Sequence, residues 1–331
     1  MGDLVTNQNC LNRKARKQRM NENIYQPYLE TSVYTCLGAY GEYAASLPDD
    51  VPSLGMLVCD QLTHPTLLYT PPSAYLEDTY FGKLASYPKE RFKDEDELFV
   101  TAAAMVAEIF RLDKNGFVSG KDVTKRITVS CRHASVLFSA LLKARGIPCR
   151  SRAGFVDFGN DGTSYTEHWV NEYWSFAESR WVLVDVDGYY EYERRFGYSQ
   201  FDLPRRKFLT ASEAWLGLRD NTLTKKLELF TAGQDILEGV CGYLFMDFHS
   251  LMNNEIFYSH QPEYLRNRFR LLSREELAEL DELALLMQNP DAVIDRKPEL
   301  MKHHEKFFLL TNSSMNELSD FYEFCRQSEN L

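Results

Sequence analysis

Between residues 131 and 186 one helical pattern is followed by three strand patterns, and this order leaves few folds open. A helix is expected over residues 131–145, where apolar side chains fill one face and extend beyond it, so that much of the helix is buried. Gly146 suits the end of a helix, and Pro148 prevents its continuation. A helix followed by an antiparallel meander predicts an α+β fold. The three strand-like runs cover residues 150–158, 165–174 and 180–186.

Three residues of this block have the side chains that a thiol nucleophile requires. Cys131 begins the expected helix, so the positive end of the helix dipole points at its sulfur and favours the thiolate. His168 lies in the second strand-like run, and Asp185 lies in the third. An imidazole beside the thiol takes its proton and a carboxylate orients the imidazole, as in a catalytic triad. Cys131, His168 and Asp185 are therefore the candidate catalytic residues.

The strand pattern also predicts that the histidine and the aspartate meet. If His168 and Asp185 are directly opposed in a hairpin, its turn is centred between Phe176 and Ala177, inside a polar connection. Their side chains would then be cross-strand neighbours on one face of the sheet. Asp187 shares that face and competes with Asp185 as the acid that orients the imidazole.

Other interpretations of these side chains stay open. A cysteine within an apolar helix is most often simply packed, and a histidine within a strand is often a satisfied, partly buried residue. His133 lies about 200° around the helix from Cys131, so it is not expected to be the base. A metal site of Cys131, His133, Cys149 and His168 is conceivable, but its spacing matches no known ligand pattern, and we expect neither a metal nor a cofactor.

The rest of the chain divides around this block. We expect a flexible basic tail, a mainly helical N-terminal region, a catalytic core and a mainly helical C-terminal region. Capping boxes at Asp94 and Ser273 predict helix starts, the first helix running to about Leu112. A further helix is expected over 208–218, and His64-Pro65 is interpreted as loop punctuation. The four regions are residues 1–23, 24–120, 121–200 and 201–331.

Composition narrows the class of protein. The formal net charge of −11 opposes generic binding to nucleic acid, so no nucleic-acid partner is expected. No apolar run reaches the roughly 18 residues of a membrane helix, so no membrane partner is expected either. The seven cysteines are odd in number and scattered, and the N-terminus has no apolar signal core. These features predict a cytoplasmic protein with reduced thiols.

Three separated sequence blocks resemble the transglutaminase-like superfamily. In that superfamily the corresponding blocks carry a nucleophilic cysteine, a histidine and an aspartate, which match Cys131, His168 and Asp185. The resemblance implies a papain-like core in which the cysteine helix packs on an antiparallel sheet. Asp185-Val186 stands where the superfamily usually has Asp-Pro, a departure that bears on the position of the acid. The blocks are 131–150, Glu167-His168-Trp169-Val170-Asn171-Glu172-Tyr173-Trp174 and Trp181-Val182-Leu183-Val184-Asp185.

More loosely, the whole chain is similar to uncharacterised bacterial proteins with this domain. The superfamily includes proteases, peptide N-glycanases, transglutaminases and acyltransferases that use carrier-bound thioesters, so the resemblance implies acyl-enzyme chemistry more firmly than a substrate. We expect a cysteine hydrolase or acyltransferase acting on a peptide, amide or thioester, with an acyl carrier protein as one alternative partner. The net acidity of the chain does not favour an acidic carrier, but the basic residues Arg194-Arg195 and Arg205-Arg206-Lys207 would suit one. The competing hypothesis is a catalytically silent binding or scaffold protein with the same fold.

Overall fold

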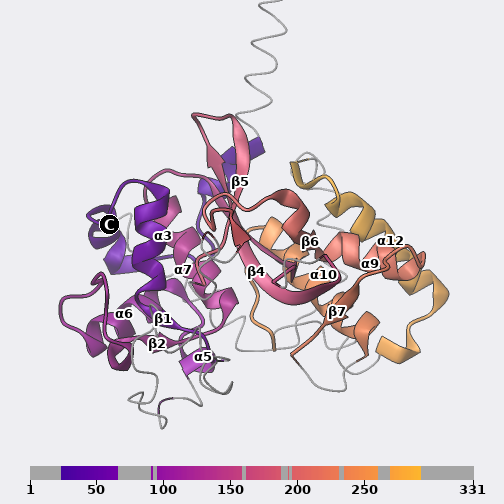
Figure 1. The fold of residues 1–331 in the computed structure, drawn as a ribbon, viewed down its shortest axis with the longest axis horizontal. Helices are drawn as coiled ribbons and strands as arrows, with labels where there is room; N and C mark the ends of the chain where they lie inside the picture. The colour runs from indigo at the N-terminus through magenta and orange to yellow at the C-terminus, as the bar shows by residue number, and fades with distance from the viewer. Residues whose placement is uncertain are drawn as a thin grey trace, which may run out of the picture.

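A five-stranded sheet lies at the centre of the protein, with helices on both sides of it (Figure 1). The structure, a computed structural model, describes residues 24–65, 91, 95–158, 162–187, 193, 196–230, 235–259 and 269–291. The strand order is β5-β4-β3-β6, and β7 pairs in parallel with the first part of β4, whereas the other pairings are antiparallel. The strands are β3 (Cys149–Val156), β4 (Ser164–Ser175), β5 (Arg180–Val184), β6 (Phe208–Thr210) and β7 (Lys226–Glu228).

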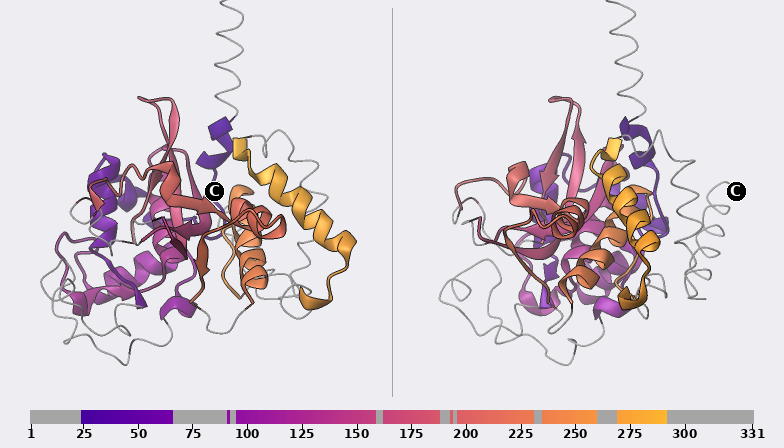
Figure 2. Two further views of the ribbon diagram at one scale, coloured as in Figure 1. Left: turned by 45° about the vertical axis from the view of Figure 1, so that its right-hand side comes forward. Right: turned by 90° about the vertical axis from the view of Figure 1, so that its right-hand side faces the viewer.

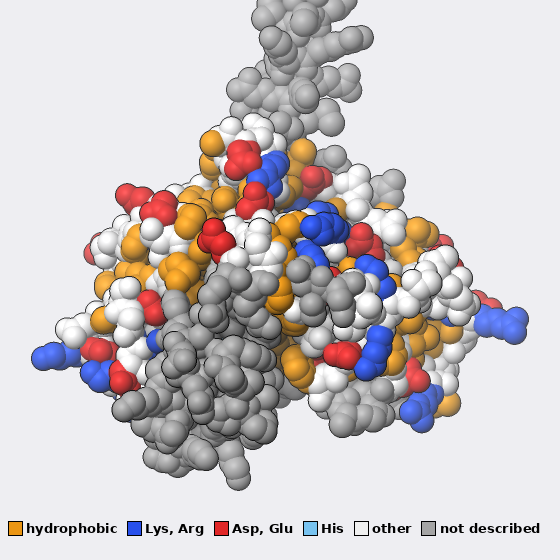
Figure 3. All heavy atoms as spheres, viewed as in Figure 1, with side chains coloured by type: hydrophobic (Ala, Val, Ile, Leu, Met, Phe, Trp, Pro, Cys, Tyr) orange, Lys and Arg blue, Asp and Glu red, His pale blue; other side chains and the backbone are white. Residues whose placement is uncertain are grey.

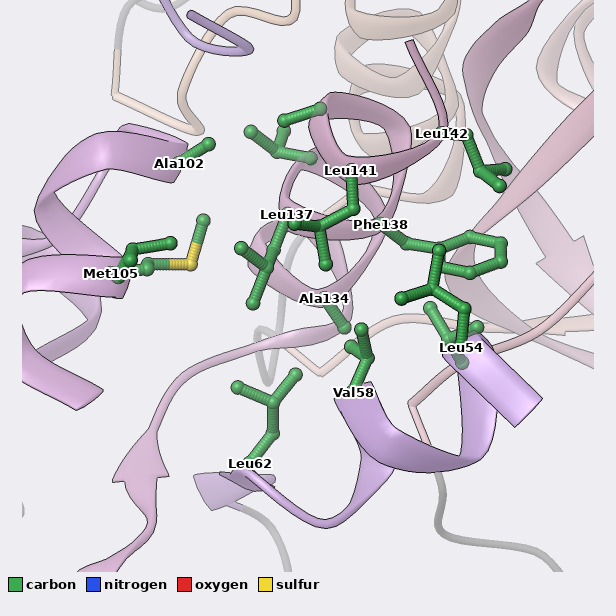
Figure 4. Packing of buried hydrophobic residues seen from close by; sticks show 14 of the residues in the cluster. Leu54, Val58, Leu62, Ala102, Met105, Ala134, Leu137, Phe138, Leu141 and Leu142 are labelled. Carbon is green, nitrogen blue, oxygen red and sulfur yellow. The ribbon is translucent and has the colours of Figure 1, made fainter. Parts of the chain in front are cut away.

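Helix α7 (Cys131–Lys143) is buried along its whole length. It packs on β3 and β4 with one face and against α3 (Val51–Cys59) and α6 (Ala102–Leu112) with another. Figure 4 shows Met105 of α6 facing Leu137, and Leu54 of α3 lying against Phe138. Because water is excluded from every side, this helix anchors the largest hydrophobic cluster of the fold.

The C-terminal helices build a second hydrophobic cluster. Helix α10 (Ile236–Leu251) packs along β3, α9 (Ala211–Arg219) packs on α10, and α12 (Arg274–Met287) packs on α9. Figure 2 shows α12 as the outer layer on this side of the described structure. Cys131 belongs to this second cluster, although the other apolar residues of α7 belong to the first. The thiol therefore lies where the two halves of the protein meet.

A short parallel pair connects the N-terminal half to α7. Strand β1 (Leu62–Thr63) pairs with β2 (Ile127–Thr128), and the Val129 N–H donates to the Thr63 carbonyl at 3.2 Å. His64 follows β1 and Cys131 lies shortly after β2, so both residues leave the same end of this pair. The remaining described elements are η1 (Gln26–Leu29), η2 (Gly38–Tyr40), α2 (Gly41–Ala45), α5 (Glu95–Leu98), η5 (Val123–Lys125), η6 (Arg205–Lys207) and η7 (Phe269–Leu271).

The α+β class and the core elements predicted from the sequence are confirmed. Helix α7 ends two residues before the predicted end, and Gly146 takes the left-handed conformation (φ 70°) that stops it. Strands β3, β4 and β5 agree with the predicted runs to within two residues at each end. The helix that begins at the Ser273 capping box is also confirmed.

Two helix predictions are wrong in their extent. The helix expected up to Leu112 is divided into α5 and α6, because Thr101 is extended and its hydroxyl caps a new helix by accepting from the Ala104 N–H. The helix expected over 208–218 begins only at Ala211, because Thr210 forms a capping box with Glu213 and the residues before it form β6. Asp94 and the expected tail of residues 1–23 lie outside the described residues.

Acidic and basic side chains are interspersed on the face shown in Figure 3. Arg205 pairs with Glu213 at 3.0 Å, and Lys207 pairs with Asp157 at 2.8 Å. Two of the basic residues that would suit an acidic carrier are thus paired with acids of the protein itself, and Arg194 and Arg195 lie outside the described residues. Within the described ranges, every helix is too short or too polar to cross a lipid bilayer.

We predict that Gly154→Ala destabilises the fold by about 1–3 kcal/mol, because the site has no room for a methyl group. A Cβ added to Gly154 would lie 2.5 Å from the backbone oxygen of Leu209 on β6, which cannot move without breaking the sheet. Chemical denaturation measures the change. Gly41→Ala is the matched control, since Gly41 has helical dihedral angles and nothing within 4 Å of its added Cβ. Equal stabilities of the two variants would contradict this account.

Candidate active site

Cys131 is the first residue of α7 and is 4% exposed. The preceding residue, Ser130, has the extended conformation of an N-cap, but its side chain makes no capping bond. Its hydroxyl contacts His133 Nδ1 at 2.9 Å and accepts from the Tyr258 hydroxyl at 3.3 Å. The Tyr258 oxygen lies 3.7 Å from the sulfur of Cys131. The positive end of the helix dipole of α7 thus lies at the thiol.

His168 and Asp185 form a buried hydrogen-bonded pair. His168 Nε2 lies 2.8 Å from Asp185 Oδ2, and both side chains are at most 2% exposed. His168 is in the middle of β4, opposite Gly154 of β3, and the edge of the Phe158 ring packs against the imidazole with ring centroids 5.0 Å apart. Because Nε2 is engaged by the carboxylate, Nδ1 is the nitrogen that can interact with a thiol. The imidazole of His168 also hydrogen-bonds to the Cys131 side chain, so the structure brings together the three residues singled out from the sequence.

The pair does not form in the predicted register. Ser175 is opposite Arg180, so the turn is centred between Ala177 and Glu178, one residue later than predicted. Ser179 adopts the left-handed conformation (φ 53°), which closes this longer turn. The direct opposition of His168 and Asp185 is therefore wrong. In the observed register Asp185 is displaced by two residues from the position directly opposite His168. Because side chains alternate between the two faces of a sheet, a displacement of two residues keeps both side chains on one face.

Asp185 follows the last residue of β5 and is fixed by the chain around it. Its N–H donates to the Gln200 carbonyl at 2.9 Å, and the Gln200 side chain donates to the Asp185 carbonyl at 3.1 Å. Its Oδ1 accepts from the N–H of Asp187 at 2.9 Å. One carboxylate oxygen thus orients the imidazole while the other is held by the backbone.

The charges at this site favour a thiolate. Burial raises the pKa of the Cys131 thiol, but the positive charges of His168 and His64, both hydrogen-bonded to the sulfur, outweigh burial and lower the pKa. Burial opposes protonation of His168, but Asp185 and Cys131 together raise its pKa well above the ordinary value. An ion pair of thiolate and imidazolium is the consistent assignment.

Other thiols show the opposite behaviour. Burial raises the pKa of Cys149 to about 12 and also raises that of Cys241. Cys149 accepts a hydrogen bond from the side chain of Asn171 at 3.6 Å on the far end of the sheet, away from the pair formed by His168 and Asp185. Among the described residues, no group of three or more potential ligands is arranged to hold a metal ion.

The sequence analysis missed His64. Its imidazole interacts with the Cys131 sulfur, and its Nε2 lies 4.0 Å from Asp187 Oδ2. Asp187, weighed above as a competitor for His168, is thus placed beside a different histidine. The spacing of two acids at 185 and 187 was a usable signal, because two carboxylates on one face can serve two bases as well as compete for one.

Residues 99–186 match the transglutaminase-like superfamily. This stretch is similar to a transglutaminase-like core. It contains α6, α7 and the meander β3 to β5, and therefore also Cys131, His168 and Asp185, whereas His64 lies outside it. The core places this part of the chain with proteins of the general cysteine-enzyme type.

Searches of known proteins add one distant likeness. A proposed cysteine protease from Cytophaga hutchinsonii has a solved structure that is 15% identical over 49% of this chain, with a TM-score of 0.29. The match spans 42% of that protein, which is less than half of its length. No curated protein matches the chain.

The lowered pKa of Cys131 predicts fast alkylation by iodoacetamide below the range of an ordinary thiol, whose pKa is about 8.5. The thiolate persists until the pH falls through the folded-state pKa, so labelling at neutral pH is rapid. In His168→Ala the main positive charge is removed, burial dominates, and the pKa of Cys131 rises, so labelling at neutral pH slows. Rates are measured across pH, with the modified residue mapped by mass spectrometry. Identical pH profiles for the two folded proteins would rule out the ion pair.

Proposed function

We propose that this protein is a cysteine-dependent enzyme that forms a thioester at Cys131 from an amide or thioester donor and passes the acyl group to water or an amine. The observation that carries the proposal is the buried cluster of Cys131 at a helix N-terminus, His168 at its sulfur, and Asp185 bonded to His168 at 2.8 Å. Nucleophile, proton carrier and orienting acid then have the roles of a catalytic triad.

The acylation step follows from this geometry. The Cys131 thiolate attacks the donor carbonyl carbon, and the carbon–sulfur bond forms as charge develops on the carbonyl oxygen. The N–H groups at the start of α7 are placed to stabilise that oxyanion. The bond to the leaving group then breaks, and His168 gives its proton to the leaving amine or thiol. Asp185 keeps the imidazole in the tautomer and orientation that this transfer needs.

The pattern of burial bears on the donor. Cys131 is 4% exposed and the Tyr258 hydroxyl lies beside its sulfur, so a donor must present a slender acyl group rather than a bulky centre. An extended peptide side chain or the acyl arm of a carrier protein has this shape. Because Arg205 and Lys207 are already paired with acids, we favour the peptide or amide donor over an acidic carrier.

The near-complete burial of the thiol also supports a second candidate function. A catalytically silent binding or scaffold protein would retain this fold with Cys131 as a packed residue. The two hypotheses differ in thiol chemistry, since a packed cysteine keeps an ordinary or raised pKa and is not acylated.

Substitution of the proposed nucleophile tests this function directly. We expect Cys131→Ala to abolish formation of a covalent acyl-enzyme with p-nitrophenyl acetate, because no other described thiol combines a helix N-terminus with two imidazoles. Intact-mass spectrometry detects the added acetyl group, and peptide mapping locates it. Cys36→Ala is the matched control, because Cys36 is a partly exposed cysteine that lies outside α7 and the sheet.

The control variant should acetylate at the wild-type rate. Acetylation of wild type and Cys131→Ala to the same extent would refute the proposed nucleophile. Wild-type protein that stays unmodified at Cys131 while remaining folded would favour the silent scaffold.

A further inference from the structure

A second imidazole reaches the Cys131 sulfur from the N-terminal half of the protein. His64 hydrogen-bonds to the thiol, as His168 does from the sheet. His64 is 7% exposed, and its Nε2 lies 4.0 Å from Asp187 Oδ2. The sulfur therefore contacts two buried imidazoles, each with a carboxylate of its own.

The position of His64 is built into the fold. It follows β1 directly, and the parallel pairing of β1 with β2 carries it to the same end as the start of α7. Pro65 disfavours a helical conformation at His64 and keeps the chain extended there. The ring of Phe230 lies near the imidazole, with centroids 6.5 Å apart. His64 is thus held against the thiol by regular pairing rather than by a surface loop.

Asp187 has a carboxylate oxygen that can accept a further hydrogen bond. Its Oδ2 is buried and has no hydrogen-bond partner within the part of the chain that the structure describes. A buried carboxylate oxygen without a donor is unfavourable, and the nearest cationic group that can supply one is the His64 imidazole. The position of Asp187 is explained if His64 carries a proton during part of the reaction. A histidine buried only for packing would need neither the sulfur nor the acid.

The groups around His64 fit a proton carrier. Burial disfavours its charged form, but Asp187 and the Cys131 sulfur favour it more strongly and raise the pKa of His64, while His168 opposes the charge. Since His64 and His168 repel one another when both are charged, the site favours one imidazolium at a time beside the thiolate. A proton on one imidazole can reach the other through the sulfur that both contact.

We infer that His64, oriented by Asp187, is a second catalytic histidine that takes the proton of the acceptor in the deacylation half of the reaction. This inference rests on the proposed function and adds a division of labour to it. His168 serves the leaving group of the donor, and His64 serves the incoming water or amine from the N-terminal side of the sulfur.

The proton balance closes over one cycle. In acylation the thiolate forms the carbon–sulfur bond, and the imidazolium of His168 protonates the departing amine or thiol, which leaves both imidazoles neutral. In deacylation the acceptor oxygen or nitrogen bonds to the acyl carbon, its proton passes to His64, and the carbon–sulfur bond breaks to return the thiolate. The proton then moves from His64 to the sulfur and from the sulfur to His168, which restores the starting state.

The two half-reactions can be measured separately on the full chain. The protein is acetylated with p-nitrophenyl acetate, the excess reagent is removed, and loss of the acetyl group from Cys131 is followed by intact-mass spectrometry. His64→Gln and Asp187→Asn test the second pair, and His168→Gln is the matched comparison. Each decay is repeated with added hydroxylamine, a strong nucleophile that attacks without help from a base.

We expect His64→Gln to slow acetylation only modestly, because His168 supplies the larger charge effect on the Cys131 thiol and the glutamine amide keeps a hydrogen-bond donor. The variant should lose the acetyl group about 10²-fold more slowly in water, the usual size of a general-base effect. Asp187→Asn should slow the same step to a smaller extent. Hydroxylamine should restore release in both variants. His168→Gln should instead fail in acetylation.

Other results would overturn the inference. Equal slowing of both steps in His64→Gln would make this residue only a stabiliser of the thiolate, and unchanged rates would give it no role. Slow decay that hydroxylamine does not restore would indicate a closed site. If His64→Gln does not fold, as judged by circular dichroism and thermal melting, His64→Asn and Asp187→Asn carry the same comparison. Wild-type protein that is never acetylated at Cys131 would contradict the proposed function itself, and this inference with it.

Discussion

Burial of α7 on all sides is the constraint on which the rest of the structure depends. A helix without a solvent face must satisfy its polar side chains inside the protein, because an unpaired buried polar group is costly. Arg132 donates to the backbone carbonyls of Val100, Glu255 and Ile256, one from the N-terminal half and two from the C-terminal half. Lys143 reaches Asn253 at 2.6 Å. These bonds close both halves around one helix, and the thiol at its N-terminus lies in the seam between them.

Electrostatics explains why so many charged groups surround one sulfur. A thiolate removed from water is strongly disfavoured unless opposite charge lies beside it, and each imidazolium that supplies this charge is itself disfavoured by burial. The carboxylates of Asp185 and Asp187 offset that second penalty. Burial of any one of these charged groups alone would be unfavourable, but the thiolate, the imidazoles and the carboxylates stabilise one another. Burial of a charged group is offset in the same way on the sheet, where buried Arg152 forms an ion pair with Asp247 at 2.8 Å.

Local sequence patterns were enough to predict the parts of the fold that local interactions determine. Helix α7 and strands β3 to β5 follow from apolar periodicity and from Gly146 and Pro148 as stop signals, and the set of Cys131, His168 and Asp185 follows from their order on these elements. Exact register could not be predicted, since it depends on the left-handed conformation of Ser179 within the turn. The separation of α5 from α6 likewise depends on a single cap at Thr101.

Contacts that join the N-terminal and C-terminal regions to the core could not be predicted. The sequence near His64 does not indicate that β1 pairs with β2, because a strand of two residues is too short to show an alternation of apolar and polar side chains. The same holds for Tyr258, which reaches Ser130 from the C-terminal half. Both contacts depend on how the two halves of the protein pack together, and the local sequence around a residue does not predict that packing.

The pairing of β1 with β2 has a consequence for the order of events in folding. It joins segments far apart in the chain, so the entropy lost in closing the loop between them must be overcome before the pair gains any stability. The helix and the meander contain mostly local contacts and are expected to assemble earlier. A newly made chain would therefore bring His168 to Cys131 before His64 arrives. The part of the site that we assign to acylation would form first, and the part that we infer for deacylation would be complete only when β1 pairs with β2.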